Sequence, residues 1–340
     1  MPRDDVDVRI RQVGLVKAGT ELKVAAILFT YRCTISCRHC LFACGGDRPD
    51  VVMSPDRCAD YLGQLHELGR VVHIAGGEPM LYWDVLAAAL ELAGRRNLSP
   101  HFIETNCSFA TGEAVVRERF GFFKRHGVFG VLLSCDPYHQ QFVPPECFLL
   151  ARRVAVEIFG AENVWASNAS DEKVREYAAI AADEARLAEH VRGSPPMFTG
   201  RACTELARFV DPFPIDQVPR MRGWTGQEQP RHCPAEFDAA GIWEIHIDPY
   251  DNIQTNCGVI LGKADRTPVG ELMSKGLQNA NLVAGILSRE GPCGLAEFAR
   301  RRHGFDVPER VRQKCELCYL TRRFLRPHYP QILGPAEIYQ

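Results

Sequence analysis

The sequence has no apolar run long enough to cross a lipid bilayer, and its first residues lack the charged-then-apolar layout of a signal peptide. It has almost no net charge, −2 at pH 7, so bulk charge does not favour a polyanionic partner. Internal repeats and low-complexity tracts are missing too. We therefore expect a cytoplasmic globular protein with neither a membrane nor a nucleic-acid partner.

The composition is ordinary for a globular protein, with 46% apolar and 24% charged residues. A chain of 340 residues is long enough for one large α/β domain and a smaller one. Its 14 cysteines are the exception. In a compartment that keeps thiols reduced, so many cysteines indicate metal binding and not disulfides.

Three of these cysteines, Cys33, Cys37 and Cys40, follow the apolar run 24–31 in a C-x3-C-x2-C pattern. Three thiolates on one loop can hold three irons of a [4Fe–4S] cluster and leave the fourth iron open to another ligand. Zinc is the competing metal, but structural zinc takes four protein ligands, usually as two separated pairs. The spacing favours an open-iron cluster.

A second motif, Gly76, Gly77, Glu78 and Pro79, comes directly after the apolar stretch 71–75. Glycines at a strand end let a ligand approach the backbone, and Glu78 offers a carboxylate or a carbonyl to an ammonium group. Alone the motif is ordinary turn composition. Here it lies about one βα unit after the cysteine loop, which makes it more informative.

Together the two motifs resemble the radical S-adenosylmethionine (radical SAM) superfamily over roughly residues 24–200. In that family the cysteine loop follows the first barrel strand, and GGEP at the end of the second strand holds the methionine amino group. The resemblance implies a [4Fe–4S] cluster on Cys33, Cys37 and Cys40, with S-adenosylmethionine at the open iron. His39 replaces the larger aromatic ring that the family often has there.

Strand-like and helix-like segments alternate through the first two hundred residues, which predicts a parallel sheet with helices outside it. Composition does not separate a doubly wound sheet from a barrel, and the resemblance implies a partial (β/α)6 barrel. The domains expected are an N-terminal extension (1–22), the core barrel (23–200), an interdomain passage (201–232) and an auxiliary iron–sulfur domain with a β-hairpin (233–340). Strands are predicted at 24–31, 71–75, 101–106, 128–135, 163–168 and Met197–Phe198, and helices at 54–68, 83–94, 114–125, 144–159 and 174–191.

A second cysteine set lies in the last hundred residues, where two strands flank a turn at 248–252. The order of these cysteines resembles the twitch domain, a shortened relative of the SPASM extension of radical SAM enzymes. The resemblance implies an auxiliary [4Fe–4S] cluster on Cys233, Cys257, Cys315 and Cys318. A zinc site with the same four thiolates is the physical rival. Cys293 is a reserve ligand, or a thiol that donates hydrogen to a substrate radical.

Polar residues also fall at predicted strand ends, where parallel barrels gather their chemistry. In related enzymes such groups contact the methionine carboxylate and the ribose hydroxyls of the cofactor; helix capping is the alternative. The cofactor-binding candidates are Thr105, Asn106, Ser134 and Asn168. Asp136, Tyr138 and His139 follow the fourth strand and can bind a polyhydroxylated substrate or act as acid and base.

The resemblance implies reductive cleavage of S-adenosylmethionine to a 5′-deoxyadenosyl radical that takes hydrogen from an unactivated carbon. The auxiliary cluster would assist electron transfer, in an oxidation or an epimerisation. A small polar metabolite (sugar, cyclitol or nucleoside) is the expected substrate, because the segment before residue 24 is too short for an N-terminal peptide-binding domain. Modification of a peptide or protein is the alternative. A non-catalytic electron carrier or redox sensor has no use for GGEP. Flavodoxin or ferredoxin is the expected electron donor.

Overall fold

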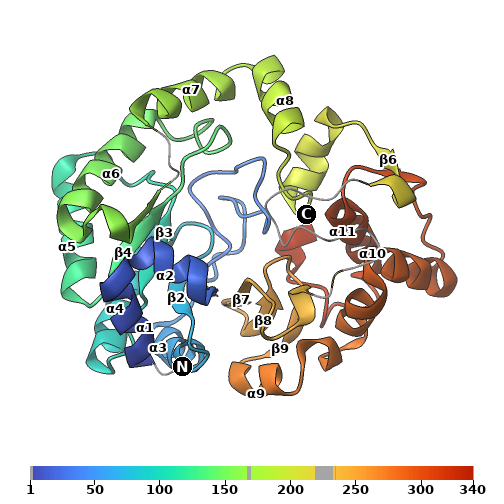
Figure 1. Ribbon diagram of the computed structural model, residues 1–340, viewed down its shortest axis with the longest axis horizontal. Coiled ribbons are helices and arrows are strands. Elements are labelled where there is room, and N and C mark those ends of the chain that lie inside the picture. Colours follow the sequence, from blue (N-terminus) through green and yellow to red (C-terminus); the bar gives the residue numbers. More distant parts are fainter. Residues whose placement is uncertain (1–2, 167–169, 219–232, 234, 340) are drawn as a thin grey trace. The chain divides into compact units, whose positions relative to one another are not determined.

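A computed structural model describes residues 3–166, 170–218, 233 and 235–339 (Figure 1). The chain forms two compact units, the first from residues 1–37, 44–184 and 246–251, the second from 38–43, 185–245 and 252–340. The division falls at Glu184, earlier than the passage expected from residue 201. None of the described helices is long and apolar enough to cross a membrane.

The first unit is built on a parallel sheet, which confirms the α/β class. Its strands pair in the order β5-β4-β3-β2-β1, each parallel to its neighbour. All five residues of β1 and of β2 are buried, as expected for a sheet covered on both faces. The strands are β1 (Val24–Leu28), β2 (Val71–Ala75), β3 (Phe102–Thr105), β4 (Gly130–Leu133) and β5 (Val164–Ala166).

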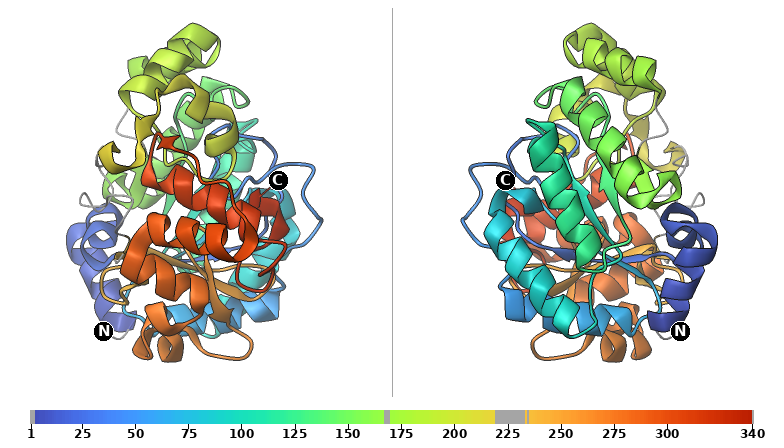
Figure 2. Two further views of the ribbon diagram at one scale, coloured as in Figure 1. Left: turned by 90° about the vertical axis from the view of Figure 1, so that its right-hand side faces the viewer. Right: turned by 90° about the vertical axis from the view of Figure 1, so that its left-hand side faces the viewer.

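The helices of this unit begin where the sequence provides a start signal. Ser54 caps one of them by accepting a hydrogen bond from the Arg57 amide, and Pro55 takes the first helical position. The right-hand view of Figure 2 shows α5 and α6 side by side. The helices are α1 (Arg3–Val13), α2 (Leu15–Leu22), α3 (Pro55–His66), η1 (Pro79–Tyr82), α4 (Trp83–Arg95), α5 (Glu113–Arg125), α6 (Pro145–Phe159), η2 (Ala161–Asn163) and α7 (Asp171–Ala181).

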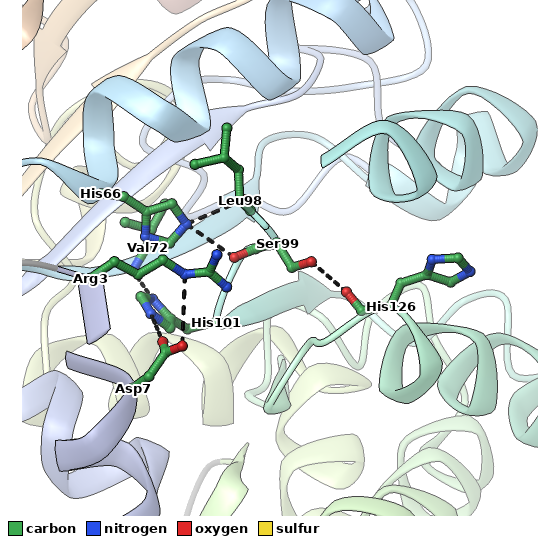
Figure 3. A network of polar contacts seen from close by, with 8 residues as sticks. All are labelled: Arg3, Asp7, His66, Val72, Leu98, Ser99, His101 and His126. Carbon is green, nitrogen blue, oxygen red and sulfur yellow. Dashed lines mark hydrogen bonds and ion pairs between the residues drawn. The ribbon is translucent and has the colours of Figure 1, made fainter. Parts of the chain in front are cut away.

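A histidine network connects α1 to the start of the sheet (Figure 3). The Val72 amide donates to Nδ1 of His101 at 2.7 Å, so the proton of that neutral ring sits on Nε2 and is donated to Asp7 at 3.0 Å. Nε2 of His66 lies 3.1 Å from the Ser99 carbonyl, and its ring meets His101 edge-on at 5.0 Å. These contacts hold two buried, uncharged imidazoles between α1 and the start of the sheet.

Two predicted elements take a different form. The single helix expected over 174–191 is two helices, α7 and α8 (Glu184–Gly193). The helix is interrupted at Asp183, a residue type that is typical of a helix N-cap. Met197–Phe198 is not a strand. The Gln313 side chain accepts from the Phe198 amide and donates to the Pro196 carbonyl, both at 2.9 Å, so side-chain bonds replace sheet pairing there.

The second unit combines a hairpin with two long helices. β8 (Asn252–Thr255) pairs antiparallel with β9 (Ile260–Lys263). The left-hand view of Figure 2 shows α10 (Leu282–His303) packed beside α11 (Lys314–Leu325), and α10 is interrupted at Gly291, just before Pro292. The other elements are η3 (Ala202–Leu206), η4 (Ala207–Phe209), β6 (Phe213–Pro214), η5 (Ile215–Gln217), η6 (Ala235–Phe237), α9 (Val269–Ser274), η7 (Leu277–Asn279), β10 (Arg310–Val311) and η8 (Ala336–Tyr339). The strand β7 (Glu244–Ile247) has its first two residues in the second unit and its last two in the first.

Candidate functional site

The loop after β1 carries the cysteine triplet. Cys33 and Cys37 belong to the first unit and are buried, and neither forms a disulfide. The Cys33 amide donates to the Gly45 carbonyl at 3.1 Å, which fixes the loop backbone at its first thiol. Cys40 lies in the segment 38–43, which groups with the second unit, and its carbonyl accepts from the Arg201 amide at 3.1 Å.

Gly76 and Gly77 are needed because the cysteine loop passes directly against them. A Cβ atom on Gly77 would lie 1.9 Å from the Arg32 carbonyl oxygen, and one on Gly76 would lie 2.6 Å from that of Thr30. The Gly77 amide donates to the same Thr30 carbonyl at 2.7 Å. Both glycines therefore position the loop that carries Cys33, a role that the sequence did not reveal.

Glu78 is completely buried, and its carboxylate accepts three hydrogen bonds from within the first unit. Oε1 accepts from the Met80 amide and the Thr105 hydroxyl, each at 3.0 Å, and Oε2 accepts from the Asn106 amide at 2.8 Å. Burial raises the pKa of Glu78 to about 7, and the three donors oppose that increase. The carboxylate joins the end of β2 to the end of β3.

Asn106 extends this connection to the cysteine loop. Its side-chain amide donates to Sγ of Cys33 at 3.5 Å and to the Thr34 hydroxyl at 3.0 Å. Its side-chain oxygen accepts from the Ser108 amide at 2.9 Å, which holds the amide group in one orientation. Three motifs that the sequence places at three strand ends are thus linked by hydrogen bonds from Glu78 to Cys33.

Asp136, Tyr138 and His139 form a compact turn after β4. Oδ1 of Asp136 accepts from the amides of Tyr138 and His139 at 2.9 and 3.0 Å, and Oδ2 lies 2.8 Å from Nδ1 of His139. Burial by itself would lower the pKa of His139, but Asp136 and the Cys37 thiol raise it well above its ordinary value. The geometry places the His139 ring beside Cys37 and holds it there through Asp136.

The remaining strand-end residues contribute less. The Ser134 amide donates to the Thr105 carbonyl at 3.0 Å, so Ser134 lies next to the end of β3. His73 stacks on Phe102 with ring centroids 4.3 Å apart and has 1% of its surface exposed, which makes it a core histidine. Asn168 lies outside the described residues.

The four cysteines predicted as auxiliary ligands converge in the second unit. Cys233, Cys257, Cys315 and Cys318 border one cavity of about 30 Å³. Cys315 and Cys318 lie three residues apart in the first turns of α11, and therefore on one face of that helix. Burial raises the pKa of Cys257 to about 11 and those of Cys233 and Cys315 further, so these thiols are neutral until a metal displaces their protons.

The spacing of the sulfurs bears on which metal group would fit. Zinc bonded to four thiolates at about 2.3 Å holds the sulfurs about 3.8 Å apart. A [4Fe–4S] cluster places irons and sulfides between its four thiolates, so it holds their sulfurs farther apart than one zinc ion does.

Two basic residues that the sequence did not single out border the same cavity. Nζ of Lys314 lies 3.5 Å from Sγ of Cys233, and Arg322 lies one helical turn after Cys318 on α11. Lys314 has 4% and Arg322 1% of its surface exposed. The four-residue spacing from Cys318 to Arg322 was the available sequence signal.

Cys293 does not border this cavity with the other four. It packs against an apolar cluster of Val218, Ala296, Val311 and Leu317 within the second unit. A thiol in that position behaves as a small apolar side chain. The geometry therefore gives no support to its predicted role as reserve ligand or hydrogen donor.

Comparison with known proteins identifies the first part of the chain. The family model described as the radical SAM superfamily matches residues 27–149, which contain the cysteine loop and the Gly76–Pro79 motif. No match was found among curated proteins.

Two similar solved structures are described as "Crystal structure of BtrN in complex with AdoMet and 2-DOIA" and "Native anSMEcpe with bound AdoMet". The first has 12% identity and a TM-score of 0.42 over 74% of this chain and 82% of its own. The second has 12% identity and a TM-score of 0.41 over 91% and 97%. Likeness at this level supports no inference about this chain. The match over residues 27–149 does: this stretch of the chain is similar to the radical SAM superfamily, whose members use a [4Fe–4S] cluster and S-adenosylmethionine.

Proposed function

We propose that this protein is a radical SAM enzyme that abstracts hydrogen from an unactivated C–H bond of a small polar metabolite such as a sugar, a cyclitol or a nucleoside. Cys33, Cys37 and Cys40 would hold the first [4Fe–4S] cluster. Cys233, Cys257, Cys315 and Cys318 would hold an auxiliary one. The first cluster and S-adenosylmethionine, when bound, supply the 5′-deoxyadenosyl radical.

The observation that carries this proposal is the hydrogen-bonded path from Glu78 through Asn106 to Cys33. An ordinary turn at Gly76–Pro79 would have no need to bury a carboxylate completely and to connect it to a thiol on another loop. An amide N–H directed at a thiolate stabilises the charged form of the sulfur that binds iron. The path thus supports one preorganised site made from three strand ends.

The turn after β4 supports a polar substrate. Asp136 fixes the ring orientation of His139, and the imidazolium can donate a hydrogen bond or hold a proton beside the reacting carbon. Tyr138 adds a phenol to this turn. A carboxylate, a phenol and an imidazole suit a molecule with several hydroxyl groups better than an apolar one.

The cavity in the second unit supports an outcome that needs electron transfer. After hydrogen abstraction, a substrate radical can become a stable product by losing an electron and a proton or by gaining an electron and a proton. A second redox group on the same chain can take part in that transfer. An oxidation or an epimerisation therefore follows from the proposal.

The first test is anaerobic incubation of the iron-reconstituted protein with S-adenosylmethionine and dithionite. We expect 5′-deoxyadenosine from the wild type and none from the variant in which Cys33, Cys37 and Cys40 are all alanine. Cys147→Ala, on α6, is the matched control and should keep the activity. Continued product formation by the triple variant would refute the assignment of the first cluster.

The substrate class has its own test. Sugars, cyclitols, nucleosides and short peptides, each deuterated at carbon, are added one at a time to the same reaction. We expect a substrate of the first three classes to transfer deuterium into 5′-deoxyadenosine. Transfer from peptides alone would overturn the small-metabolite proposal and leave the radical chemistry intact.

A further inference from the structure

The cavity bordered by Cys233, Cys257, Cys315 and Cys318 is unusual in the charges it buries. Lys314 and Arg322 both border it, and both are almost completely buried. Glu236 borders it too and offsets one of the two positive charges. Lys314 adjoins Cys315, and Arg322 follows Cys318 by one turn, so α11 carries both cations and two of the thiols.

The Arg322 side chain hydrogen-bonds to Cys318, one of the thiols that border the cavity. Its guanidinium donates to the Tyr339 hydroxyl at 2.9 Å and to the Thr199 hydroxyl at 3.4 Å. Burial raises the pKa of Tyr339 to about 12, although Arg322 opposes the increase, so the phenol is neutral at physiological pH. Threonine is neutral as well.

Lys314 likewise lies against a thiol of the cavity, with its Nζ 3.5 Å from Sγ of Cys233. A buried cation among neutral groups is costly unless an anion is placed beside it. Two buried cations that each contact a thiol of this cavity, with Glu236 offsetting one of the two charges, therefore indicate that its native occupant is anionic. A metal group with four thiolate ligands meets that requirement.

We propose that Arg322 and Lys314 are the counter-cations of the auxiliary cluster and that they make its reduced state more accessible. This inference rests on the proposed auxiliary [4Fe–4S] cluster. One-electron reduction adds a negative charge to an already anionic group, and nearby buried cations stabilise the product more than the reactant. Both side chains act on the cluster as positioning and charge-balancing residues.

In a net oxidation the added electron has a defined source. Hydrogen abstraction from the carbon of an alcohol leaves a carbon radical next to the hydroxyl group. The carbonyl would form by loss of one electron and of the hydroxyl proton, and a cluster held by the four cysteines would supply the electron acceptor. A more accessible reduced state favours this direction of electron flow.

The test compares Arg322→Gln and Arg322→Lys with Arg323→Gln, an exposed arginine on the same helix. Iron and sulfide are counted, and the auxiliary cluster is titrated anaerobically with its reduced form detected by electron paramagnetic resonance. The first cluster is removed from all samples by the Cys33, Cys37 and Cys40 alanine background, so that one signal remains. At the wild-type midpoint potential, the ratio of reduced to oxidised cluster should be at least tenfold lower in Arg322→Gln. This ratio corresponds to a decrease of the midpoint potential by about 59 mV for one electron. Arg322→Lys keeps the positive charge, so its midpoint should return most of the way to the wild-type value. Arg323→Gln should match the wild type.

Lys314→Gln is the second variant and should shift the ratio in the same direction. If a glutamine variant takes up no iron, the stability of its metal-free full chain is measured by unfolding and compared with that of the metal-free wild type. A variant whose metal-free form is as stable as the wild type has lost only the anionic occupant, which supports the proposal. Equal loss of stability in metal-free and iron-loaded protein means that the cation serves the fold alone, and overturns it. Unchanged midpoints in both glutamine variants also overturn it, whereas zinc in the wild-type site would refute the auxiliary cluster itself.

Discussion

Replacement of Glu78 tests the connection between the two sequence motifs. The Glu78 side chain is completely buried and accepts hydrogen bonds from Met80, Thr105 and Asn106. Glu78→Ala removes all three acceptor contacts. In Glu78→Gln the carbonyl can still accept from Met80 and Thr105, while the new amide group faces the Asn106 N–H, donor against donor.

The number of lost hydrogen bonds sets the expected magnitude. A buried donor left without an acceptor costs about 1 kcal/mol or more. At pH 4, below the pKa of Glu78 both when unfolded (about 4.5) and when folded (about 7), the charge of the carboxylate contributes little to the comparison. We therefore expect Glu78→Ala to lower the free energy of unfolding by about 3 kcal/mol there, and Glu78→Gln by about 1 kcal/mol.

The same pKa predicts how the comparison changes with pH. A carboxyl group whose pKa is about 7 when folded and about 4.5 when unfolded binds more protons in the folded state between those values. Stability from this group is therefore present below about pH 4.5 and is lost as pH rises through 7, by about 3 kcal/mol in total. Glu78→Gln lacks this loss, so its stability relative to the wild type should improve between pH 5 and pH 8.

The assay is urea denaturation of the metal-free protein followed by circular dichroism, with hydrogen exchange over residues 102–110 to locate the change. In the iron-loaded protein, Glu78→Ala should also weaken S-adenosylmethionine binding or slow its cleavage, with the iron content maintained. Unchanged urea midpoints and unchanged exchange at Asn106 would refute the structural reasoning. Unchanged cofactor affinity and cleavage would refute the role of Glu78 in the cofactor site.

Two further perturbations follow from the first unit. Gly77→Ala should displace the cysteine loop, because its Cβ would lie 1.9 Å from the Arg32 carbonyl; iron bound by the first cluster should be lost, and a normal iron content would contradict this. Burial, with smaller effects of His101 and Arg3, lowers the pKa of His66 to about 3, so stability from this group is present above about pH 6.5 and is lost as pH falls toward 3, by about 1.4 kcal/mol per pH unit. His66→Gln should flatten this part of the urea-midpoint profile, and an unaltered profile would show that His66 does not titrate as proposed.

Much of the first unit could be predicted because its signals are local. Ser54 and Pro55 start α3 as expected, and Val71–Ala75 is β2 with the predicted bounds. The predictions for 174–191 and for Met197–Phe198 were wrong because distant or competing polar groups decided them. Gln313, more than a hundred residues away, satisfies the backbone of Phe198, and no pattern near residue 198 contains that information.

The sequence by itself determined the chemistry: the cysteine spacing, GGEP one βα unit later and the alternation of strands and helices are short-range patterns, readable without coordinates. Only the tertiary structure decided what each group contacts. It buried the Glu78 carboxylate against Asn106, directed Asn106 at Cys33, and placed Lys314 and Arg322 around four thiols that come from three separate stretches of chain. The physical reason is that burial and charge pairing depend on distances between residues remote in sequence, which packing alone fixes.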